Sequence, residues 1–404
     1  MQKTIPAVAK IRGKVQHYAW GGLSFIPNLI GFDNTSNTPC AEYWMGAHPS
    51  ASSIVTNVNE PLNTIIENNK EAMLTTKINE QFGELPFLFK VLDVKDMLSI
   101  QVHPTKEEAV KGFEKEEALG IAINASNRNY KDKNHKPEIM IALGEFWLLH
   151  GFLSVEKIQQ VLEENMEFNS LLKHFETKNI KQLMEHVYTL PQEEVDLILK
   201  PLLLRENAKK QAQQLTKHHP GWWACKTFDV IHNSISNIDR GIFSIYFFNI
   251  VEVQRGEAVF QAAGVPHAYL EGQNIELMAN SDNVLRGGLT PKHVDVPELL
   301  KHTIFEPVVP NIMQGNLINN FERNYTCPVP DFDISLIKMN TNDVFNTKAI
   351  SPEIIINVEG TVDITFNQSN LTLKKGEVCF IQPKTDYTLK VEAGNVELYK
   401  AFVT

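Results

Sequence analysis

The stretch Met97-Leu98-Ser99-Ile100-Gln101-Val102-His103-Pro104 alternates apolar and polar residues and ends at a proline. In a β-strand, this period of two turns the aliphatic residues toward one face and Ser99, Gln101 and His103 toward the other. The aliphatic face is typical of a protein core. The polar face carries a hydroxyl, an amide and an imidazole spaced about 7 Å apart. It is therefore either a solvent-exposed face or one wall of a metal site.

The composition is that of a globular protein with more than one core. The chain has 404 residues, of which 43% are hydrophobic and 21% are charged. This length predicts two or three domains. The net charge of −10 argues against nucleic acid or an anionic membrane as the main partner. A local group of cations could still bind a small anionic molecule, because distant charges are screened by salt.

Cysteine usage and the N-terminus predict the cellular compartment. The four cysteines are scattered without a C-x-x-C pair, which fits reduced thiols better than disulfides or a zinc knuckle. Residues 1–15 lack the apolar core of a signal peptide, and no apolar run approaches the length of a membrane span. We therefore expect a cytoplasmic protein that does not associate with a membrane. The sequence leaves the oligomeric state open, and we favour a monomer.

The residue pattern changes twice along the chain and divides it into three stretches. Strand-like, turn-rich sequence runs from Lys10 to Leu149 and is interrupted by a helical tract over 67–82. Apolar residues then recur at helical intervals from Ser154, a good N-cap residue, to His218. After Pro220 the strand pattern returns, with predicted strands over 241–253, 258–262 and 267–270, a helical turn over 296–301, and short strands over 340–404. These patterns predict a mainly β fold with a helical insertion.

A short internal repeat indicates two domains of one kind. The segments 256–260 and 376–380 share the pattern G-E-x-x-F, and gapless extension places His267 opposite Tyr387. If the repeat is real, the second domain has lost this imidazole. Five residues are few, so chance similarity is the alternative.

Four polar groups are candidates for chemistry: Ser99, Gln101 and His103; residues 134–138; residues 266–269; and Glu276 with residues 280–292. Each alone has a plain structural explanation, such as a core histidine, an exposed Lys136–Glu138 ion pair or the turn chemistry of Asp282. Together they offer two imidazoles, a carboxylate and an amide oxygen. This set suits zinc or another divalent ion in Lewis-acid chemistry.

Six motifs occur in a fixed order: His17-Tyr18-Ala19-Trp20-Gly21-Gly22, Glu42-Tyr43-Trp44-Met45-Gly46-Ala47-His48-Pro49, Gln101-x-His103-Pro104, Asn134-His135-Lys136-Pro137-Glu138, Pro266-His267-Ala268-Tyr269 and Ser281-Asp282-Asn283…Arg286…Gly288-Leu289-Thr290-Pro291-Lys292. Together they resemble the type I mannose-6-phosphate isomerases, zinc enzymes of the cupin class. The resemblance covers most of the chain.

The resemblance implies roles for individual residues. It assigns one Zn²⁺ per chain to Gln101, His103, Glu138 and His267, and it places Arg286 in the active site. It makes His135, Lys136 and Asp282 candidates for ring opening and proton transfer, with Glu276 as the alternative base to Lys136. Ser99 and Lys292 are candidates for holding the phosphate, and Tyr269 and Trp20 for further substrate contacts, with a core or wall role as the alternative for Trp20.

The resemblance also implies a fold and a reaction. The fold would have two cupin (jelly-roll) β-barrel domains and one α-helical domain. A catalytic domain would span 1–152 and 220–305, a helical insertion 153–219, and a C-terminal cupin-like domain without a metal site 306–404. The reaction would interconvert mannose 6-phosphate and fructose 6-phosphate through a cis-enediol. A non-catalytic cupin that binds sugar phosphate or metal, and an isomerase or epimerase of another phosphorylated sugar, are the alternatives.

Overall fold

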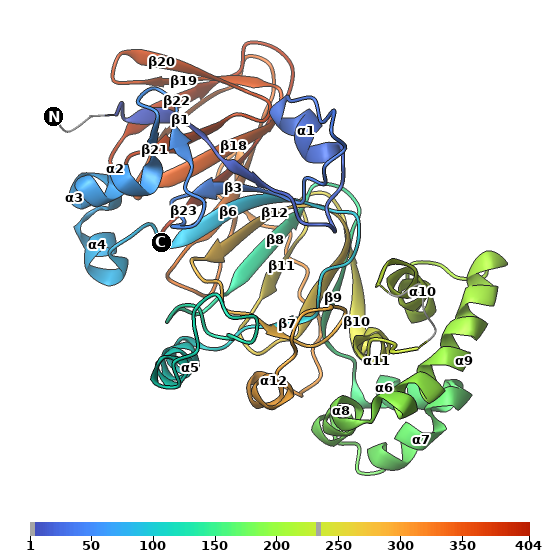
Figure 1. Ribbon diagram of the computed structural model, residues 1–404. Helices are drawn as coiled ribbons and strands as arrows, with labels where there is room; N and C mark the ends of the chain where they lie inside the picture. The colour runs from blue at the N-terminus through green and yellow to red at the C-terminus, as the bar shows by residue number, and fades with distance from the viewer. Residues whose placement is uncertain (1–4, 232–235) are drawn as a thin grey trace.

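The computed structural model describes residues 5–231 and 236–404, which form a strand-rich body with a helical region at one end (Figure 1). Helices take up 28% of the chain and strands 31%, so the fold is more evenly mixed than the predicted, mainly β protein. The described strands form three antiparallel sheets of ten, nine and four strands. Within these described residues, the hydrogen-bonded strands do not close into the two barrels that the resemblance implies.

The ten-stranded sheet carries most of the candidate site residues. Its strands are β2 (Lys14–Gln16), β3 (Glu42–Gly46), β6 (Phe87–Val94), β7 (Gln101–Val102), β8 (Glu138–Ala142), β9 (Phe146–Phe152), β10 (Phe248–Val253), β11 (Ala258–Gln261), β12 (His267–Ala279) and β13 (Leu285–Arg286). The longest strand, β12, pairs with β6, β7, β8 and β9. It therefore joins segments that lie far apart in the sequence.

The other two sheets contain the predicted C-terminal strands. The nine-stranded sheet consists of β14 (Asn316–Leu317), β15 (Glu322–Tyr325), β16 (Asp333–Met339), β23 (Val396–Phe402), β18 (Glu353–Glu359), β21 (Val378–Ile381), β1 (Val8–Arg12), β4 (Ile54–Val55) and β5 (Glu60–Pro61). The four-stranded sheet consists of β17 (Val344–Lys348), β22 (Asp386–Lys390), β19 (Thr361–Phe366) and β20 (Ser369–Lys374). The N-terminal strand β1 pairs with β21 and so joins the two ends of the chain.

The largest apolar core joins the two large sheets. Ile139 and Ile141 of β8 belong to the same buried cluster as Ile354 and Ile356 of β18. Alternation along β8 sends Met140 to the opposite face, where it packs in a smaller core near the candidate site. Because both faces of β8 are buried, this strand is a continuous apolar run after its first residue.

The helical region follows β9. It contains α6 (Val155–Glu164), α7 (Asn169–Leu172), α8 (Ile180–Thr189), α9 (Gln192–Gln211), α10 (Pro220–Ile231), α11 (Gly241–Phe247) and short 3₁₀ turns over Met166–Phe168 and Lys173–Phe175. The predicted cap at Ser154 is confirmed, because its hydroxyl accepts a hydrogen bond from the Lys157 amide at 3.3 Å. The predicted helical spacing is likewise confirmed up to Gln211, whereas residues 212–218 form no helix.

The helical region extends beyond residue 219, where the sequence predicts the return of strands. The predicted strand over 241–253 is wrong in its first half, because Gly241–Phe247 is helix α11 and only Phe248–Val253 is strand. Every residue of α11 is buried. A short apolar run of this kind has no polar spacing that could distinguish a helix from a strand. Pro220 begins α10 at a position where its missing N–H does not weaken a helix.

Six further helices lie outside this region: α1 (Phe25–Ile30), α2 (Leu62–Asn68), α3 (Lys70–Leu74), α4 (Thr76–Phe82), α5 (Lys106–Ala118) and α12 (Val296–His302). The tract predicted over 67–82 is broken into short helices, and the turn predicted over 296–301 is confirmed as α12. Helix α5 was not predicted. Its signal is the pair Thr105 and Glu108, since the Thr105 hydroxyl accepts a hydrogen bond from the Glu108 amide.

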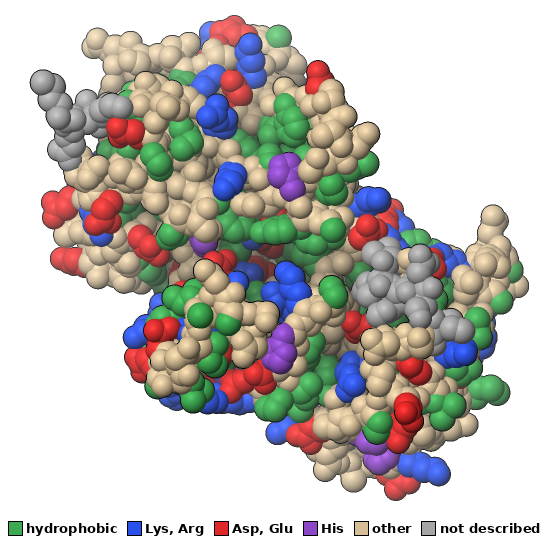
Figure 2. Space-filling model, in the orientation of Figure 1, with side chains coloured by type: hydrophobic (Ala, Val, Ile, Leu, Met, Phe, Trp, Pro, Cys, Tyr) green, Lys and Arg blue, Asp and Glu red, His purple; other side chains and the backbone are tan. Residues whose placement is uncertain are grey.

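The surface shown in Figure 2 intersperses acidic and basic side chains, as expected for a globular protein with a modest net charge. No helix in the described ranges is both long enough and apolar enough to cross a membrane.

Candidate active site

The ends of three strands bring the predicted metal ligands together. His267 is the first residue of β12 and lies opposite Gln101 of β7. Glu138 is the first residue of β8 and lies opposite Met278, near the other end of β12. His103 follows β7 directly. Sheet pairing thus joins residues separated by more than 160 positions in the sequence.

The imidazoles of His103 and His267 both face the carboxylate of Glu138. The Nε2 atoms of the two histidines lie 3.4 Å from Glu138 Oε1 and Oε2, respectively. All three candidate ligand atoms lie within 4.8 Å of one another. The three side chains are at most 5% exposed. Three potential ligands are therefore held in a buried cluster of the right size for one metal ion.

The hydrogen bonds of the two histidines test whether the cluster fits a cation. Nδ1 of His103 lies 2.9 Å from the carbonyl oxygen of Asn283, and Nδ1 of His267 lies 3.0 Å from that of Val265. A carbonyl oxygen can only accept, so each Nδ1 carries the proton and each Nε2 presents a lone pair. Both Nε2 atoms are buried without a hydrogen-bond partner. Two lone pairs and a carboxylate directed at one point fit a zinc ion.

The charge state of His103 agrees with this arrangement. Burial and the nearby Lys136 ammonium lower the pKa of His103 to about 4. The pKa of Glu138 lies well below its usual range, because Lys136 and the histidines outweigh the effect of burial. A neutral imidazole and an ionised carboxylate are the forms that bind metal.

Gln101 completes the predicted set. Its side chain lines a recess of about 40 Å³ together with Glu138 and His267. The recess lies beside a larger cavity of about 740 Å³, which Gln101 also lines. Gln101 thus lines the same recess as two of the three clustered residues.

The alternation predicted around Gln101 is confirmed only in part. Ser99 and Gln101 line the cavity, whereas Ile100 and Val102 are buried in a core. Leu98 also lines the cavity, although the alternation assigns it to the core face. The reason is that regular strand pairing begins only at Gln101, so the period of two does not hold before Ser99.

The large cavity contains most of the predicted catalytic and substrate-binding residues. These are Trp20, Ser99, Lys136, Asp282, Arg286 and Lys292, and the predicted metal ligand Gln101 lines the same cavity. Glu276 and Tyr269 line the adjoining recess. The cavity is also lined by Tyr18, Glu42, Trp44 and Lys90, which were not predicted as site residues.

Lys90 is the most important of the residues that were missed. Its Nζ donates to Glu276 Oε2 at 2.9 Å, lies 3.5 Å from Glu42 Oε2, and lies 5.2 Å from the centroid of the Trp44 ring. Burial would lower the pKa of Lys90, but Glu276 and Glu42 outweigh it, so the pKa is raised and the amine stays charged. The available signal is a lysine in the middle of the apolar strand Phe87–Val94.

Glu276 lies opposite Lys90 in the β12–β6 pair. Burial raises its pKa, and the Lys90 ammonium opposes this shift. Lys136, the other candidate base, lies with its Nζ 3.0 Å from Glu138 Oε1. Each candidate base is thus paired with an opposite charge at the site.

The structure separates the two predicted ring-opening residues. Asp282 lines the cavity, and its Oδ2 lies 3.9 Å from Nε2 of His48. His135 is not among the lining residues, and its Nε2 lies 3.0 Å from Asp331 Oδ2. His48 Nδ1 accepts from the Ser50 amide at 3.3 Å, so Nε2 carries the proton that faces Asp282.

Arg286 and Lys292 form a cationic end of the cavity. Arg286 lies opposite Gln101 in the β13–β7 pair. Partial burial lowers the pKa of Arg286, and the weaker desolvation of the more exposed Lys292, together with the Arg286 charge, lowers the pKa of Lys292. Neither side chain has an acidic partner within 4.0 Å in the part of the chain that the structure describes. Two neighbouring cations without an acidic partner are suited to an anion such as a phosphate.

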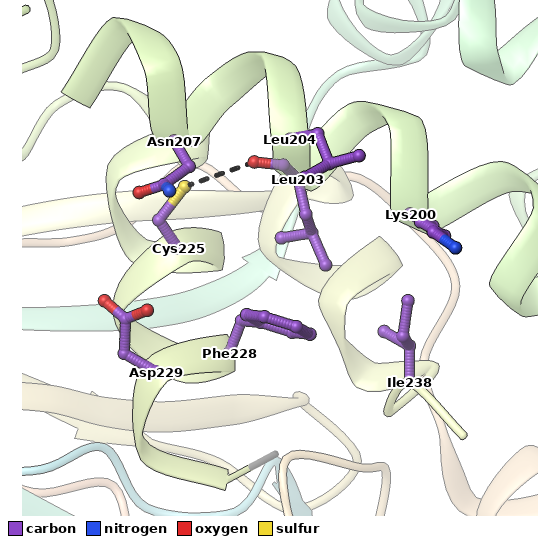
Figure 3. A pocket seen from close by; sticks show the side chains of 8 residues that line it. All are labelled: Lys200, Leu203, Leu204, Asn207, Cys225, Phe228, Asp229 and Ile238. Carbon is purple, nitrogen blue, oxygen red and sulfur yellow. Dashed lines mark hydrogen bonds between the residues drawn. The ribbon is translucent and has the colours of Figure 1, made fainter. Parts of the chain in front are cut away.

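A second pocket lies in the helical region, between α9 and α10 (Figure 3). Its volume is about 60 Å³, and its lining includes Leu203, Cys225, Phe228 and Ile238. Cys225 Sγ contacts the carbonyl oxygen of Leu203 at 4.0 Å, and burial raises the pKa of this thiol to about 11. A small apolar pocket with an unreactive thiol does not compete with the large cavity as a site for a sugar phosphate.

Comparisons with known proteins agree with this site. A family model described as the catalytic domain of type I phosphomannose isomerase matches residues 8–155. The mannose-6-phosphate isomerase of Salmonella typhimurium is 39% identical over 380 residues, covering 92% of this chain and 94% of that protein. The human mannose-6-phosphate isomerase is 32% identical, covering 96% of each chain.

Solved structures give the same result. The structure of Salmonella typhimurium mannose 6-phosphate isomerase bound to fructose 6-phosphate and zinc aligns with a TM-score of 0.87 and 35% identity. The alignment covers 99% of this chain and 100% of that one. A structure of a mannose 6-phosphate isomerase with zinc and yttrium also aligns with a TM-score of 0.87. From the buried histidine–glutamate cluster, the relatives and the shared fold, we conclude that this chain belongs to the type I phosphomannose isomerases.

Proposed function

We propose that the cavity interconverts mannose 6-phosphate and fructose 6-phosphate. The observation that carries this proposal is one cavity lined by Gln101, Arg286 and Lys292, with Glu138 and His267 of the metal cluster lining the adjoining recess. A sugar phosphate has the matching polarity, with hydroxyl and carbonyl oxygens at one end and a dianion at the other.

Gln101, His103, Glu138 and His267 would hold the zinc ion. When bound, zinc supplies a Lewis acid that polarises sugar oxygens and stabilises negative charge near them. The two imidazoles are already fixed in the correct tautomer by Asn283 and Val265. The two imidazoles therefore need no change of tautomer to accept a cation.

Arg286, Lys292 and Ser99 would bind the phosphate. Arg286 is adjacent to Gln101 across the strand pair and also close to Lys292. It is therefore the residue that can contact either the phosphate or the reacting end of the sugar. The Ser99 hydroxyl lines the same cavity and adds a neutral donor.

Proton transfer between C1 and C2 needs a base near the zinc ligands. Glu276 and Lys136 both meet this condition. Glu276 is now paired with Lys90, and Lys136 with Glu138, so each side chain would have to leave this partner before it could take a proton from the substrate. Lys90 has a different role, because its ammonium lies between Glu276 and Glu42 and keeps both carboxylates in place. Hydrogen–deuterium exchange at C2 would separate the two candidates.

The exchange experiment compares Lys136→Ala with Glu276→Gln. We expect the variant that lacks the base to lose C2 exchange by at least about 100-fold, because general base catalysis contributes this much. The other variant should retain exchange even where overall turnover is slowed. Equal retention by both variants would exclude both residues as the base.

We assign ring opening to Asp282, with His48 rather than His135 as its neighbour. The Nε2–H of His48 faces Asp282 and would keep this carboxylate directed into the cavity. His135 is instead paired with Asp331, and its contribution would be to hold the segment that carries Lys136.

The strand-rich parts of the chain support two cupin-type jelly-roll domains. The catalytic domain would combine residues 1–152 with a segment that begins at Phe248 and ends near 305, and the second cupin-type domain would span 306–404. The helical insertion would then span 153–247, because α10 and α11 pack with the helices that precede them. We further propose that the chain acts as a cytoplasmic monomer, without a nucleic acid or membrane partner. Size-exclusion chromatography with light scattering tests the oligomeric state.

The assay that tests the function couples fructose 6-phosphate formation to a dye or cofactor readout. We expect turnover of mannose 6-phosphate that is lost on chelation and restored by Zn²⁺. Saturable binding of the sugar phosphate without turnover would instead support a non-catalytic binding protein. Turnover of another phosphorylated sugar at a higher kcat/KM would support a different isomerase.

A further inference from the structure

Five strands of the nine-stranded sheet repeat five strands of the ten-stranded sheet. The order is β11-β8-β12-β6-β3 in one sheet and β21-β18-β23-β16-β15 in the other, and every neighbouring pair is antiparallel. We call them the first and second strand sets. The G-E-x-x-F repeat leads into β11 and β21, which hold the same place in each set. The short sequence repeat is therefore part of a structural repeat.

The two sets also share their strand register. Glu138 and Ile139 lie opposite Gln261 and Phe260 in the first set. The equivalent pairs in the second set are Glu353 with Ile381 and Ile354 with Phe380. Both glutamates follow a proline and begin their strand. By register, Glu353 therefore occupies the position of Glu138.

The other ligand positions follow from the neighbouring pairs. His267 lies opposite Gln101, and Tyr387 lies opposite Thr347. The carbonyl oxygen of His103 accepts from the Gly264 amide at 2.9 Å, and that of Ala349 accepts from the Lys384 amide at 2.6 Å. The equivalents of Gln101, His103, Glu138 and His267 are thus Thr347, Ala349, Glu353 and Tyr387. Only the glutamate is retained.

A lysine takes the place of Glu276. In the first set, Glu276 lies opposite Met140, two residues after Glu138. In the second set, Lys400 lies opposite Ile355, two residues after Glu353. A second carboxylate is retained on the outer strand of each set, β3 and β15. Glu42 lies opposite Leu92 in the first set, and Glu322 lies opposite Ile337 at the equivalent position in the second. Lys400 therefore lies between the positions equivalent to Glu42 and Glu138. In the first set the ammonium beside Glu42 comes from Lys90, which faces Glu276, whereas the residue that faces Lys400 is Ser335.

The contacts of Lys400 match this placement. Its Nζ lies 2.7 Å from Glu322 Oε1 and 3.9 Å from Glu353 Oε1. The hydroxyl of Tyr387 donates to Glu353 Oε2 at 2.7 Å. All four residues are at most 6% exposed. Carboxylates buried to this extent need a cation or hydrogen-bond donors around them.

We propose that the second strand set is a converted copy of the metal-binding set, in which the single Lys400 ammonium supplies beside Glu322 and Glu353 the positive charge that Lys90 and a metal ion supply beside Glu42 and Glu138. This inference goes beyond the isomerase reaction, because it assigns an internal cation site to the C-terminal half. It follows that removal of the ammonium leaves two buried carboxylates and a phenol. The two carboxylates are oxygen ligands of the kind that a hard divalent cation such as Mn²⁺ prefers.

The experiment measures the thermal midpoint of the zinc-loaded full chain with and without Mn²⁺. Lys400→Met removes the charge at similar length. Lys338→Met is the matched control, because Lys338 lies on β16 of the same strand set with a side chain that is 55% exposed and paired with Glu397. We expect Lys400→Met to lower the midpoint by about 10 °C and Mn²⁺ to restore at least half of this loss. The control should shift by about 2 °C or less and respond to Mn²⁺ no more than the unmodified chain.

Two results obtained with folded Lys400→Met would overturn the proposal. One is a midpoint of Lys400→Met within about 2 °C of the unmodified chain. The other is an equal response of Lys400→Met and Lys338→Met to Mn²⁺. If Lys400→Met does not fold, the double variant Lys400→Met/Glu322→Gln, which buries one charge fewer, should regain folding and lack the Mn²⁺ response. Failure of both variants to fold would also refute the assignment.

Discussion

Arg286 and Lys292, the two cations of the cavity, give a prediction about phosphate binding. The burial of each side chain sets how much its removal should weaken that binding. Arg286→Met and Lys292→Met both remove a charge that we assign to phosphate binding. Arg286 is half-buried beside Gln101, whereas Lys292 is exposed. We expect both variants to raise the KM for mannose 6-phosphate, with the larger effect for Arg286.

The expected magnitudes follow from these environments. A hydrogen bond to a charged group contributes about 1.5–3 kcal/mol when it is shielded from water. For Arg286 this corresponds to a loss of roughly 10- to 150-fold in kcat/KM at about 1.4 kcal/mol per tenfold. An exposed ion pair contributes at most about 1 kcal/mol, so Lys292→Met should lose roughly fivefold. The Lys292 effect should also shrink at high salt, because the charge is exposed.

The assay determines kcat and KM for mannose 6-phosphate and for mannose, at low and high ionic strength. Lys133→Met is the control, since Lys133 is exposed and paired with Glu114 at 2.9 Å. If Arg286 binds only phosphate, its loss should raise KM for the phosphorylated sugar and leave turnover of mannose unchanged. A fall in kcat for both sugars would show that Arg286 acts on the reacting end instead. An unchanged KM in both variants would refute the phosphate assignment of this end of the cavity.

Three further predictions address the metal, the buried charges and the ring-opening residue. His103→Ala should bind less than one zinc per chain by metal analysis, and chelation should lower both activity and the thermal midpoint of the unmodified chain; full activity after verified metal removal would contradict the site. In denaturant titrations, Lys90→Met should lower the free energy of unfolding by about 3–5 kcal/mol, because two buried carboxylates lose their cation. The control Lys133→Met, at an exposed position, should change it by less than about 1 kcal/mol. Asp282→Asn should lower kcat by about 100-fold, whereas His135→Ala should keep kcat within about tenfold of the unmodified chain; the reverse order would return ring opening to His135.

The chemistry-bearing motifs could be read from the sequence because they are local. A proline directly after His103, a dense polar cluster before Glu138 and a short motif around His267 each mark the end of a strand. The sequence pattern does not distinguish a helix from a strand in a segment that is completely buried. Helix α11 was predicted as strand because a fully buried segment lacks the polar residues that give a helix its period.

Residues that act through partners distant in the sequence could not be assigned in the same way. Lys90 was missed because its meaning depends on Glu276, which lies 186 positions later and faces it only across a strand pair. His135 stands next to Lys136 in the sequence, yet its side chain is drawn toward Asp331, which lies 196 positions later. Neighbouring positions at a strand end point in different directions, so adjacency in the sequence does not place two side chains in one site.

The sequence by itself determined which chemical groups this protein can use and in which order they occur along the chain. Its six motifs indicated the family, the metal and the candidate ligands, because these depend on residue type and local spacing. Only the tertiary structure decided which of the groups meet, since strand register sets the neighbours of each side chain. The same register placed Glu353 and Lys400 in the positions of Glu138 and Glu276, a correspondence that five shared residues in the sequence could not establish.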